Sequence, residues 1–210
     1  VFVIDQEFNK NSSIGLANTN VLRSGEFRDA NVSSLVFNLA NRKNSYALTG
    51  DASTSTIRED QENTTGFAGN LAFRKTEGKI RYRLENRFSD EKYDKNDLGF
   101  NQTNNYMDFI GNISYQIFEP TKKFNNYRFD FFAGYFRRFD PGVYTGNWIE
   151  LNYFFQLLNQ FAYGGYVGTN IGERTDYFEP RTEGRYWVKD PQSEIYGWIS
   201  TDYRKKFAID

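Results

Sequence analysis

Apolar and polar side chains alternate at every second position along most of the chain, which indicates β-strands with two different faces. The segment 79–88 shows the pattern well, because Ile80, Tyr82, Leu84 and Phe88 share one face and charged side chains occupy the other. A strand with an apolar face and a charged face fits a wall that has lipid on one side and water on the other.

This alternation predicts about twelve strands, and no window of similar length has the 3.6-residue period of an amphipathic helix. The expected strands cover 1–8, 12–22, 31–41, 45–56, 66–76, 79–88, 103–117, 126–139, 143–157, 160–172 and 193–203, with a last strand that starts at 207. The 4 prolines all fall in connections, as a continuous sheet requires, because proline removes a hydrogen bond from the ladder. We therefore expect one all-β domain over residues 1–210.

Short and long connections alternate between the expected strands. Tight turns are expected at 9–11, 41–44, 76–78, 158–159 and 204–206, and longer polar loops at 23–30, 57–65, 89–102 and 173–192. The tight turn 140–142 is an exception, since the alternation calls for a long loop there. Outer-membrane barrels have short turns at the periplasmic end and long loops outside. The pattern predicts an antiparallel up-and-down transmembrane β-barrel in a bacterial outer membrane.

Both ends of the chain suggest that this barrel is larger than the sequence. The chain begins with Val-Phe-Val-Ile-Asp, and residues 207–210 resemble the start of a further strand. We therefore expect the 210 residues to be a section of a larger barrel.

Composition excludes several classes of function. Phe, Tyr and Trp make up 19% of a chain whose mean hydropathy is −0.73, which suits a barrel with a narrow apolar band and a wet interior. Histidine and cysteine are absent, which removes Ser-His-Asp and Cys-His catalysis and the usual zinc ligands. A net charge of −1 gives no basic field for nucleic acid. We expect no enzymatic activity, metal or cofactor, although paired carboxylates for glycoside hydrolysis stay an open alternative.

Charged side chains share the inward face of the expected strands 79–88 and 126–139. We expect these residues to face the barrel interior: Arg81, Arg83, Glu85, Arg87, Arg128, Asp130 and Arg138. They fit an interior that selects anions, or a ladder of cross-strand ion pairs that fills and rigidifies the barrel. The presence of both signs favours the ion pairs.

Aromatic residues occupy both faces of the expected strand 126–139. Phe129, Phe131 and Tyr135 form an expected lipid face, whereas Phe132 and Phe136 lie on the opposite face. The interior there should therefore be lined with aromatic rings or covered by a plug.

The loop 173–192 combines aromatic rings with alternating charges. Rings beside Glu and Arg are typical of sugar-binding surfaces, so the candidate binding residues are Tyr177, Phe178, Glu179, Arg181, Arg185 and Trp187. The alternative is a self-packed, ion-paired loop folded over or into the barrel, and composition favours this alternative.

The loop Ser89–Asp97 is acidic and rich in oxygen ligands, which suits calcium. It lacks the ordered ligand spacing of a calcium loop, so a solvated external loop is the favoured interpretation.

Several segments resemble one known family. They are Phe8–Gly15, Asp97–Phe100, Asn112–Tyr115, Phe118–Pro120, the run DYFEPRTEGR at 176–185 and Ser200–Lys206. Together they resemble a family of Bacteroidetes-type outer-membrane β-barrels of unknown function, often fused to an N-terminal module similar to family 9 carbohydrate-binding modules. The resemblance implies an outer-membrane barrel, and it carries neither a catalytic residue nor a sugar-binding residue over to this chain.

Two functional hypotheses follow. The first is an outer-membrane β-barrel that serves as a channel or as an envelope component in glycan handling or secretion. Its expected partners are membrane lipid and lipopolysaccharide, other outer-membrane or secretion-complex proteins, and glycans. The alternative is a soluble secreted β-protein that binds carbohydrate through its aromatic residues.

Overall fold

The computed structural model describes residues 1–25, 27–60, 62–97, 99 and 103–210. Its strands are β1 (Phe2–Phe8), β2 (Ser12–Val21), β3 (Asp29–Ala40), β4 (Tyr46–Glu59), β5 (Glu62–Lys75), β6 (Ile80–Ser89), β7 (Tyr106–Ile117), β8 (Phe124–Arg137), β9 (Tyr144–Leu157), β10 (Ala162–Thr169), β11 (Arg174–Asp176), β12 (Trp187–Lys189) and β13 (Ser193–Ser200). In the part of the chain that the structure describes there is no helix, and none therefore that is long and apolar enough to cross a membrane.

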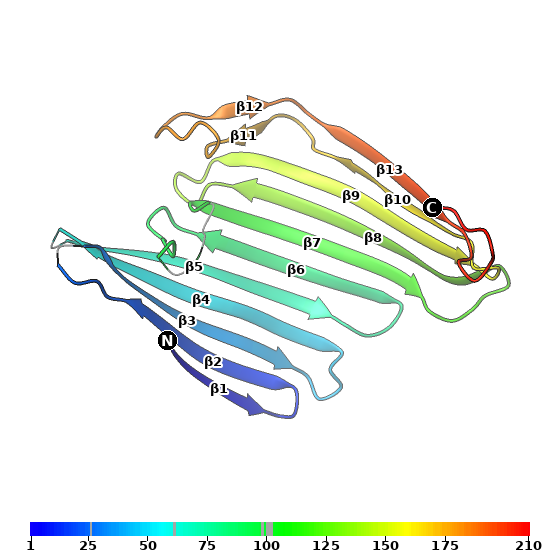
Figure 1. The fold of residues 1–210 in the computed structure, drawn as a ribbon, viewed down its shortest axis with the longest axis horizontal. Helices are drawn as coiled ribbons and strands as arrows, with labels where there is room; N and C mark the ends of the chain where they lie inside the picture. The colour runs from blue at the N-terminus through cyan, green and yellow to red at the C-terminus, as the bar shows by residue number, and fades with distance from the viewer. Residues whose placement is uncertain (26, 61, 98, 100–102) are drawn as a thin grey trace. The chain divides into compact units, whose positions relative to one another are not determined.

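Eleven strands form one antiparallel up-and-down sheet (Figure 1), in the order β1 to β10 followed by β13. β11 and β12 pair only with each other, as a separate two-stranded sheet. Among the described residues β1 does not pair with β13, so the sheet is not closed into a barrel. The predicted all-β, up-and-down architecture is thus confirmed.

Three expected boundaries are wrong. Residues 201–210 form turns and bends, so the strand expected from 207 is absent from this described segment. The expected long loop 57–65 belongs mostly to strands, because Glu59 at the end of β4 pairs with Glu62 at the start of β5. The expected loop 173–192 contains the β11–β12 hairpin. Leu98 and residues 100–102, which fall in the expected loop 89–102 and in the Asp97–Phe100 resemblance, lie outside the described residues.

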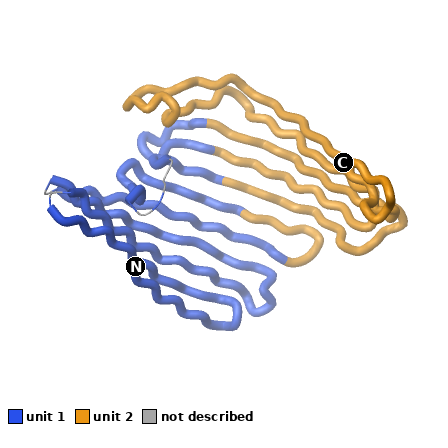
Figure 2. The backbone as a smooth tube through the Cα atoms, in the orientation of Figure 1, with its two compact units in different colours: residues 1–76, 84–109, 136–145 blue, residues 77–83, 110–135, 146–210 orange. Residues whose placement is uncertain are grey.

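The chain forms two compact units (Figure 2): unit 1 comprises 1–76, 84–109 and 136–145, and unit 2 comprises 77–83, 110–135 and 146–210. In unit 1 the strand register aligns apolar side chains in rows on one face. Ile4 pairs with Leu16, and Leu16 pairs with Leu35. These three side chains are 52%, 53% and 37% exposed, so no protein layer covers this apolar face.

Very few apolar side chains of the chain are buried. Among the described residues they are Ala30, Ala47, Ile57, Ala72, Tyr93, Ile117 and Ala162, four of which are alanines. A soluble domain buries large aliphatic and aromatic side chains instead, because these contribute most of the hydrophobic free energy. Over the described residues the sheet therefore has no buried core of large aliphatic side chains.

In unit 2 aromatic rings occupy the apolar face. The ring centroid of Phe155 in β9 lies 5.0 Å from that of Tyr163 in β10 and 5.3 Å from that of Phe129 in β8. Phe131 and Tyr135 of β8 are exposed on this face, and their contact with lipid stays a prediction. The opposite face of unit 2 is polar, and it carries the groove described next.

Candidate functional site

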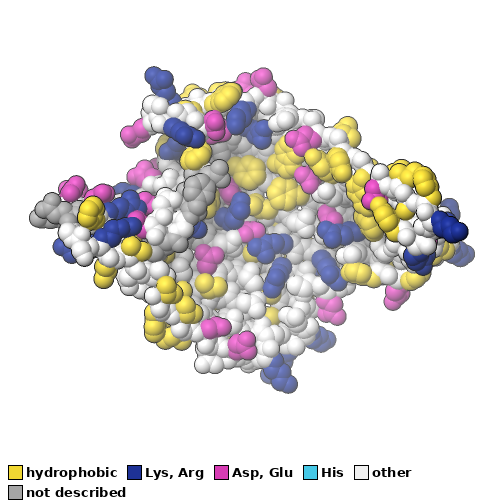
Figure 3. Space-filling model, viewed as in Figure 1, with side chains coloured by type: hydrophobic (Ala, Val, Ile, Leu, Met, Phe, Trp, Pro, Cys, Tyr) yellow, Lys and Arg dark blue, Asp and Glu magenta, His cyan; other side chains and the backbone are white. Residues whose placement is uncertain are grey.

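A groove of about 960 Å³ opens on the polar face of unit 2, between side chains of β7, β8, β9, β10 and β13. Its volume lies at the upper end of the range of small-molecule sites, roughly 300–1,000 Å³. The face that Figure 3 presents carries hydrophobic side chains next to acidic and basic ones over these strands. Residues that line the groove include Phe132, Trp148, Phe154, Tyr166, Tyr196 and Trp198.

The aromatic rings of this groove are set into the sheet by two glycines of β10. Gly164 pairs with Phe154 on one side and with Trp198 on the other. A Cβ at Gly164 would lie 2.8 Å from Cζ2 of Trp198, so only glycine lets the indole pack against the strand. Trp198 thereby reaches Phe154, with 5.9 Å between the ring centroids.

Gly168 has the same role for Trp148, whose indole takes the space that a Cβ at Gly168 would need. The indole Nε1 of Trp148 donates a hydrogen bond of 2.9 Å to Glu150 Oε2. Asn152 Nδ2 donates one of 2.5 Å to Glu150 Oε1. The Glu150 carboxylate is therefore held at a fixed place in the groove by two neutral donors.

Arg128 and Asp130, predicted to face the interior, both line the groove and form an ion pair. Asp130 is only 7% exposed and also accepts a hydrogen bond from Ser114 Oγ. This pair lies within β8 rather than across two strands, so both predicted roles of the interior charges, a rigidifying ladder of cross-strand ion pairs and anion selection, stay predictions here.

The other predicted interior charges also have partners. Arg87 Nη2 in β6 contacts Asp108 Oδ2 in β7 at 2.8 Å, and Glu85 accepts a hydrogen bond from Asn70 in β5. Arg81 lies 5.1 Å from the ring centroid of Phe118. The guanidinium of Arg138, just past the end of β8, donates to the Asp140 carbonyl at 3.3 Å. Arg83 lies in β6 between Arg81 and Glu85, and none of these five residues lines the groove.

The predicted binding loop 173–192 is a self-packed hairpin. Tyr177 contacts Tyr186 with 5.1 Å between ring centroids, and Lys189 Nζ contacts Asp176 Oδ2 at 2.7 Å. The hydrogen bond from Lys189 lowers the pKa of Asp176. None of the six candidate binding residues lines the groove: Tyr177, Phe178, Glu179, Arg181, Arg185 and Trp187. The Trp187 residue is 57% exposed. This agrees with the self-packed alternative, and sugar binding by this loop stays a prediction.

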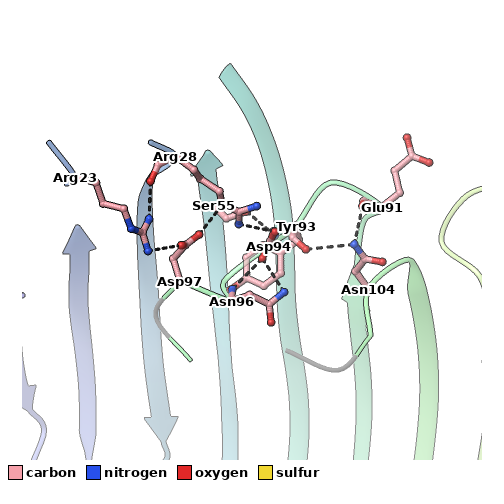
Figure 4. Close-up of polar contacts among 9 residues, drawn as sticks. All are labelled: Arg23, Arg28, Ser55, Glu91, Tyr93, Asp94, Asn96, Asp97 and Asn104. Atoms are coloured by element: carbon pink, nitrogen blue, oxygen red, sulfur yellow. Dashed lines mark hydrogen bonds and ion pairs between the residues drawn. The ribbon is translucent and has the colours of Figure 1, made fainter. Parts of the chain in front are cut away.

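A second feature lies on the polar face of unit 1, where the connection after β6 covers the sheet (Figure 4). Tyr93 is 7% exposed, so the expectation of a solvated external loop is wrong at this residue. Ser55 Oγ accepts a hydrogen bond of 2.9 Å from the backbone N–H of Asp94. Gly66 lies so close to the backbone of Lys92 and Tyr93 that a Cβ there would overlap with it.

The same loop is tied to the residues before β3 by four side chains, which we call the arginine clamp: Arg23, Arg28, Asp94 and Asp97. Arg28 Nη2 contacts Asp94 Oδ2 at 2.7 Å, and its Nε contacts Asp97 Oδ2 at 2.7 Å. Arg23 Nη2 contacts Asp97 Oδ1, also at 2.7 Å.

Burial acts to raise the pKa of both clamp carboxyls, but their hydrogen bonds outweigh it. For Asp94 the opposing groups are the Asn96 backbone N–H and the Arg28 guanidinium. For Asp97 they are the Arg23 and Arg28 guanidinium groups. Both carboxyls therefore have a pKa below the ordinary 3.8.

The clamp also weakens the case for a calcium site in the loop Ser89–Asp97. Arginine occupies the Asp94 and Asp97 carboxylates that a cation would need. Among the residues that the structure describes, no group of three or more His, Cys, Asp or Glu is placed to hold a metal ion.

The groove aromatics were not singled out by the sequence, although a signal exists. The run Gly164-Gly-Tyr-Val-Gly168 places two glycines on either side of a tyrosine on one face of a strand. Such glycines mark places where a neighbouring group approaches the strand closely. Phe132, on the face opposite the expected lipid face, was the other indication.

The fold and the groove define an all-β protein with one exposed apolar face and one polar, ring-lined face. The family model of a domain of unknown function, DUF5916, matches residues 1–210, and the chain belongs to this family. The predicted membership of a domain family of unknown function is thus confirmed over the whole chain. Comparison with curated proteins and with solved structures gives no significant match.

Proposed function

We propose that the chain is part of the wall of a bacterial outer-membrane β-barrel, with its apolar face toward lipid and its polar face toward a water-filled interior. The exposed apolar face carries this proposal. Large apolar side chains lie uncovered on strands of both units: Ile4, Leu16, Phe67, Leu71, Leu84, Ile113, Phe131, Leu151 and Val167. In water such a surface invites aggregation, whereas in lipid it is the required surface.

The length of the strands supports the proposal. β4, β5, β8 and β9 each have 14 residues, and a tilted membrane strand needs roughly 9–11. Backbone groups at an open sheet edge are intolerable in lipid. The outer edges of β1 and β13 therefore pair with further strands in the membrane, which closes the barrel.

The interior face supports a role in passage or binding rather than in catalysis. Its charges are paired across and along strands, as in Arg87–Asp108 and Arg128–Asp130, so the face is polar and fixed in shape. We propose that the barrel acts as a channel or as an envelope component in glycan handling or secretion. Lipid and lipopolysaccharide surround it, and other envelope proteins are its expected partners.

The alternative is a soluble secreted protein that binds carbohydrate. It requires a buried core, and the buried apolar set of the described residues, mainly alanine, does not favour it.

Membrane association tests the proposal directly. The protein should fractionate with outer membranes, need detergent for extraction, and migrate differently in SDS gels before and after boiling, as folded barrels do. A folded, monodisperse monomer in buffer without detergent would overturn the proposal. Conductance across planar bilayers then tests whether the interior is open.

A further inference from the structure

We propose that the groove of unit 2 binds a neutral oligosaccharide, with Trp148 and Trp198 as the rings on which sugar units stack. This inference rests on the proposed function, since it places the groove on the water-filled side of the wall. A pyranose has an apolar C–H face and a rim of hydroxyl groups. It therefore needs an aromatic surface with hydrogen-bonding side chains around it, and the groove combines both.

The aromatic surface is built into the sheet. Both indoles pack against β10 at Gly168 and Gly164, and Tyr166 between these glycines stacks on Tyr196 with 5.8 Å between ring centroids. Rings fixed in this way lose little conformational entropy when a ligand stacks on them. The rings come from three adjacent strands, so the surface extends across the sheet and suits an extended chain of several sugar units.

The hydrogen-bonding groups lie among the rings. Glu150 and Asn152 stand beside Trp148 in β9, and three carboxamides from β7 and β8 line the same groove: Asn112, Gln116 and Asn126. Carboxamides both donate and accept, and carboxylates accept, which matches hydroxyl groups that do both. Several of these groups already bond within the protein, as Asn126 does to Gln156, and their remaining donors and acceptors face the groove. An apolar ligand would displace water from these remaining donors and acceptors at a cost in free energy.

The charge of the groove selects a neutral ligand. Among its described lining residues the only cation is Arg128, and its guanidinium is bound to Asp130. Glu150 adds a carboxylate that neutral donors hold in place. An anionic ligand, such as a uronate or a phosphorylated sugar, would meet two carboxylates and one guanidinium that already pairs with one of them, and so a net negative lining.

Tryptophan fluorescence tests this inference, because two of the 3 tryptophans line the groove and Trp187 does not. A Trp187→Phe variant of the full-length protein, in a detergent without a sugar headgroup, would be titrated with hexasaccharides of glucose, xylose, mannose and N-acetylglucosamine. At least one should give a saturable change in emission, and oligogalacturonate should give none. The inference is wrong if no neutral hexasaccharide binds saturably, or if the acidic one binds more tightly.

Matched variants then locate the site by calorimetry. Trp198→Ala should weaken binding about tenfold, a loss typical of one aromatic contact. Trp187→Ala, on the hairpin, should leave the affinity unchanged. Asn152→Ala removes a hydrogen-bonding group without removing a ring, and it should also weaken binding. This variant tests the site even if Trp198→Ala fails to fold. Equal losses in the Trp187 and Trp198 variants would overturn the assignment.

Gel migration before and after boiling is measured on every variant, so that failure to insert in a membrane is distinguished from failure to bind sugar. A variant that folds in the membrane and does not bind supports the site. A wild-type protein that inserts and binds no sugar would leave the barrel proposal standing and remove this inference.

Discussion

Ser55 and Gly66 are direct partners across β4 and β5, and together they form the seat on which the loop after β6 rests. Ser55 Oγ accepts the Asp94 N–H, and the missing side chain of Gly66 admits the backbone of Lys92 and Tyr93. The seat and the arginine clamp hold the same few residues of the loop from two directions. The loop thus covers part of the polar face of unit 1 as a fixed element.

Replacing Gly66 by valine should displace the loop. The new side chain would overlap with backbone atoms, which have no rotamer to change. Trypsin cleavage after Lys92 and Lys95 should then accelerate, on the order of tenfold, because cleavage follows the population of the open loop. Gly99→Ala is the matched control, since a Cβ there meets no atom within 4 Å. Unchanged cleavage in the Gly66 variant would show that the loop does not rest on this seat.

Arg28→Gln should loosen the loop by removing a guanidinium group that contacts both Asp94 and Asp97. Arg28→Lys should restore only part of the effect, because an ammonium group lacks the planar fork that reaches two carboxylates at once. The rate of trypsin cleavage in increasing NaCl measures this. The wild-type loop should loosen as salt screens the partly exposed pairs, whereas the glutamine variant should show little dependence on salt.

Acid should release the same loop. The pKa values of Asp94 and Asp97 are lowered in the folded protein, so the unfolded loop binds more protons. The stability contributed by the clamp is therefore fully present above the ordinary pKa of 3.8, and it is lost as pH falls below that value through the folded pKa values. Since the chain has no cysteine, a dye on Glu91→Cys reports the loop alone. Its fluorescence anisotropy should drop as the pH falls below 3.8, and with Arg28→Gln the transition should move upward or disappear.

A charge should destabilise the protein far more on one face of β2 than on the other. Leu16 lies in the apolar row with Ile4 and Leu35, whereas its neighbour Ala17 pairs with Val3 and Ser34 on the other face. Leu16→Arg should destabilise the protein in lipid vesicles by about 2–4 kcal/mol if it lies near the bilayer midplane. Ala17→Arg should cost much less, since its side chain reaches water. Urea unfolding in vesicles measures both, and equal losses would contradict the assignment of faces.

The alternation of side chains was sufficient to predict most strands and both faces, because the register of a sheet fixes which residues share a face. β8 is an example: Phe129, Phe131 and Phe132 lie on the predicted faces. The pattern gave too little information on the connections. The segment 57–65 contains polar and charged residues that suit a loop or an exposed strand end equally, and pairing of Glu59 with Glu62 decides between them.

The candidate site was less predictable, because it depends on contacts between distant segments. Nothing in the sequence near Ser89–Asp97 indicates that this loop will pack against Ser55 and Gly66. Likewise, the positions of Trp148 and Trp198 differ by 50 residues, and only the register of β9, β10 and β13 brings both indoles against one strand. Composition instead pointed to 173–192, where Tyr177 packs on Tyr186.

The near absence of large buried side chains has a consequence for biogenesis. Burial of alanine contributes far less free energy than burial of leucine or phenylalanine, so the described strands gain little hydrophobic free energy from forming the sheet in water. If the sheet lies in a membrane as we propose, most of the favourable free energy becomes available only when the apolar face meets acyl chains. On the proposed function, the polypeptide must therefore travel to the membrane unfolded, protected by a holdase chaperone, and strand pairing and insertion occur as one cooperative event.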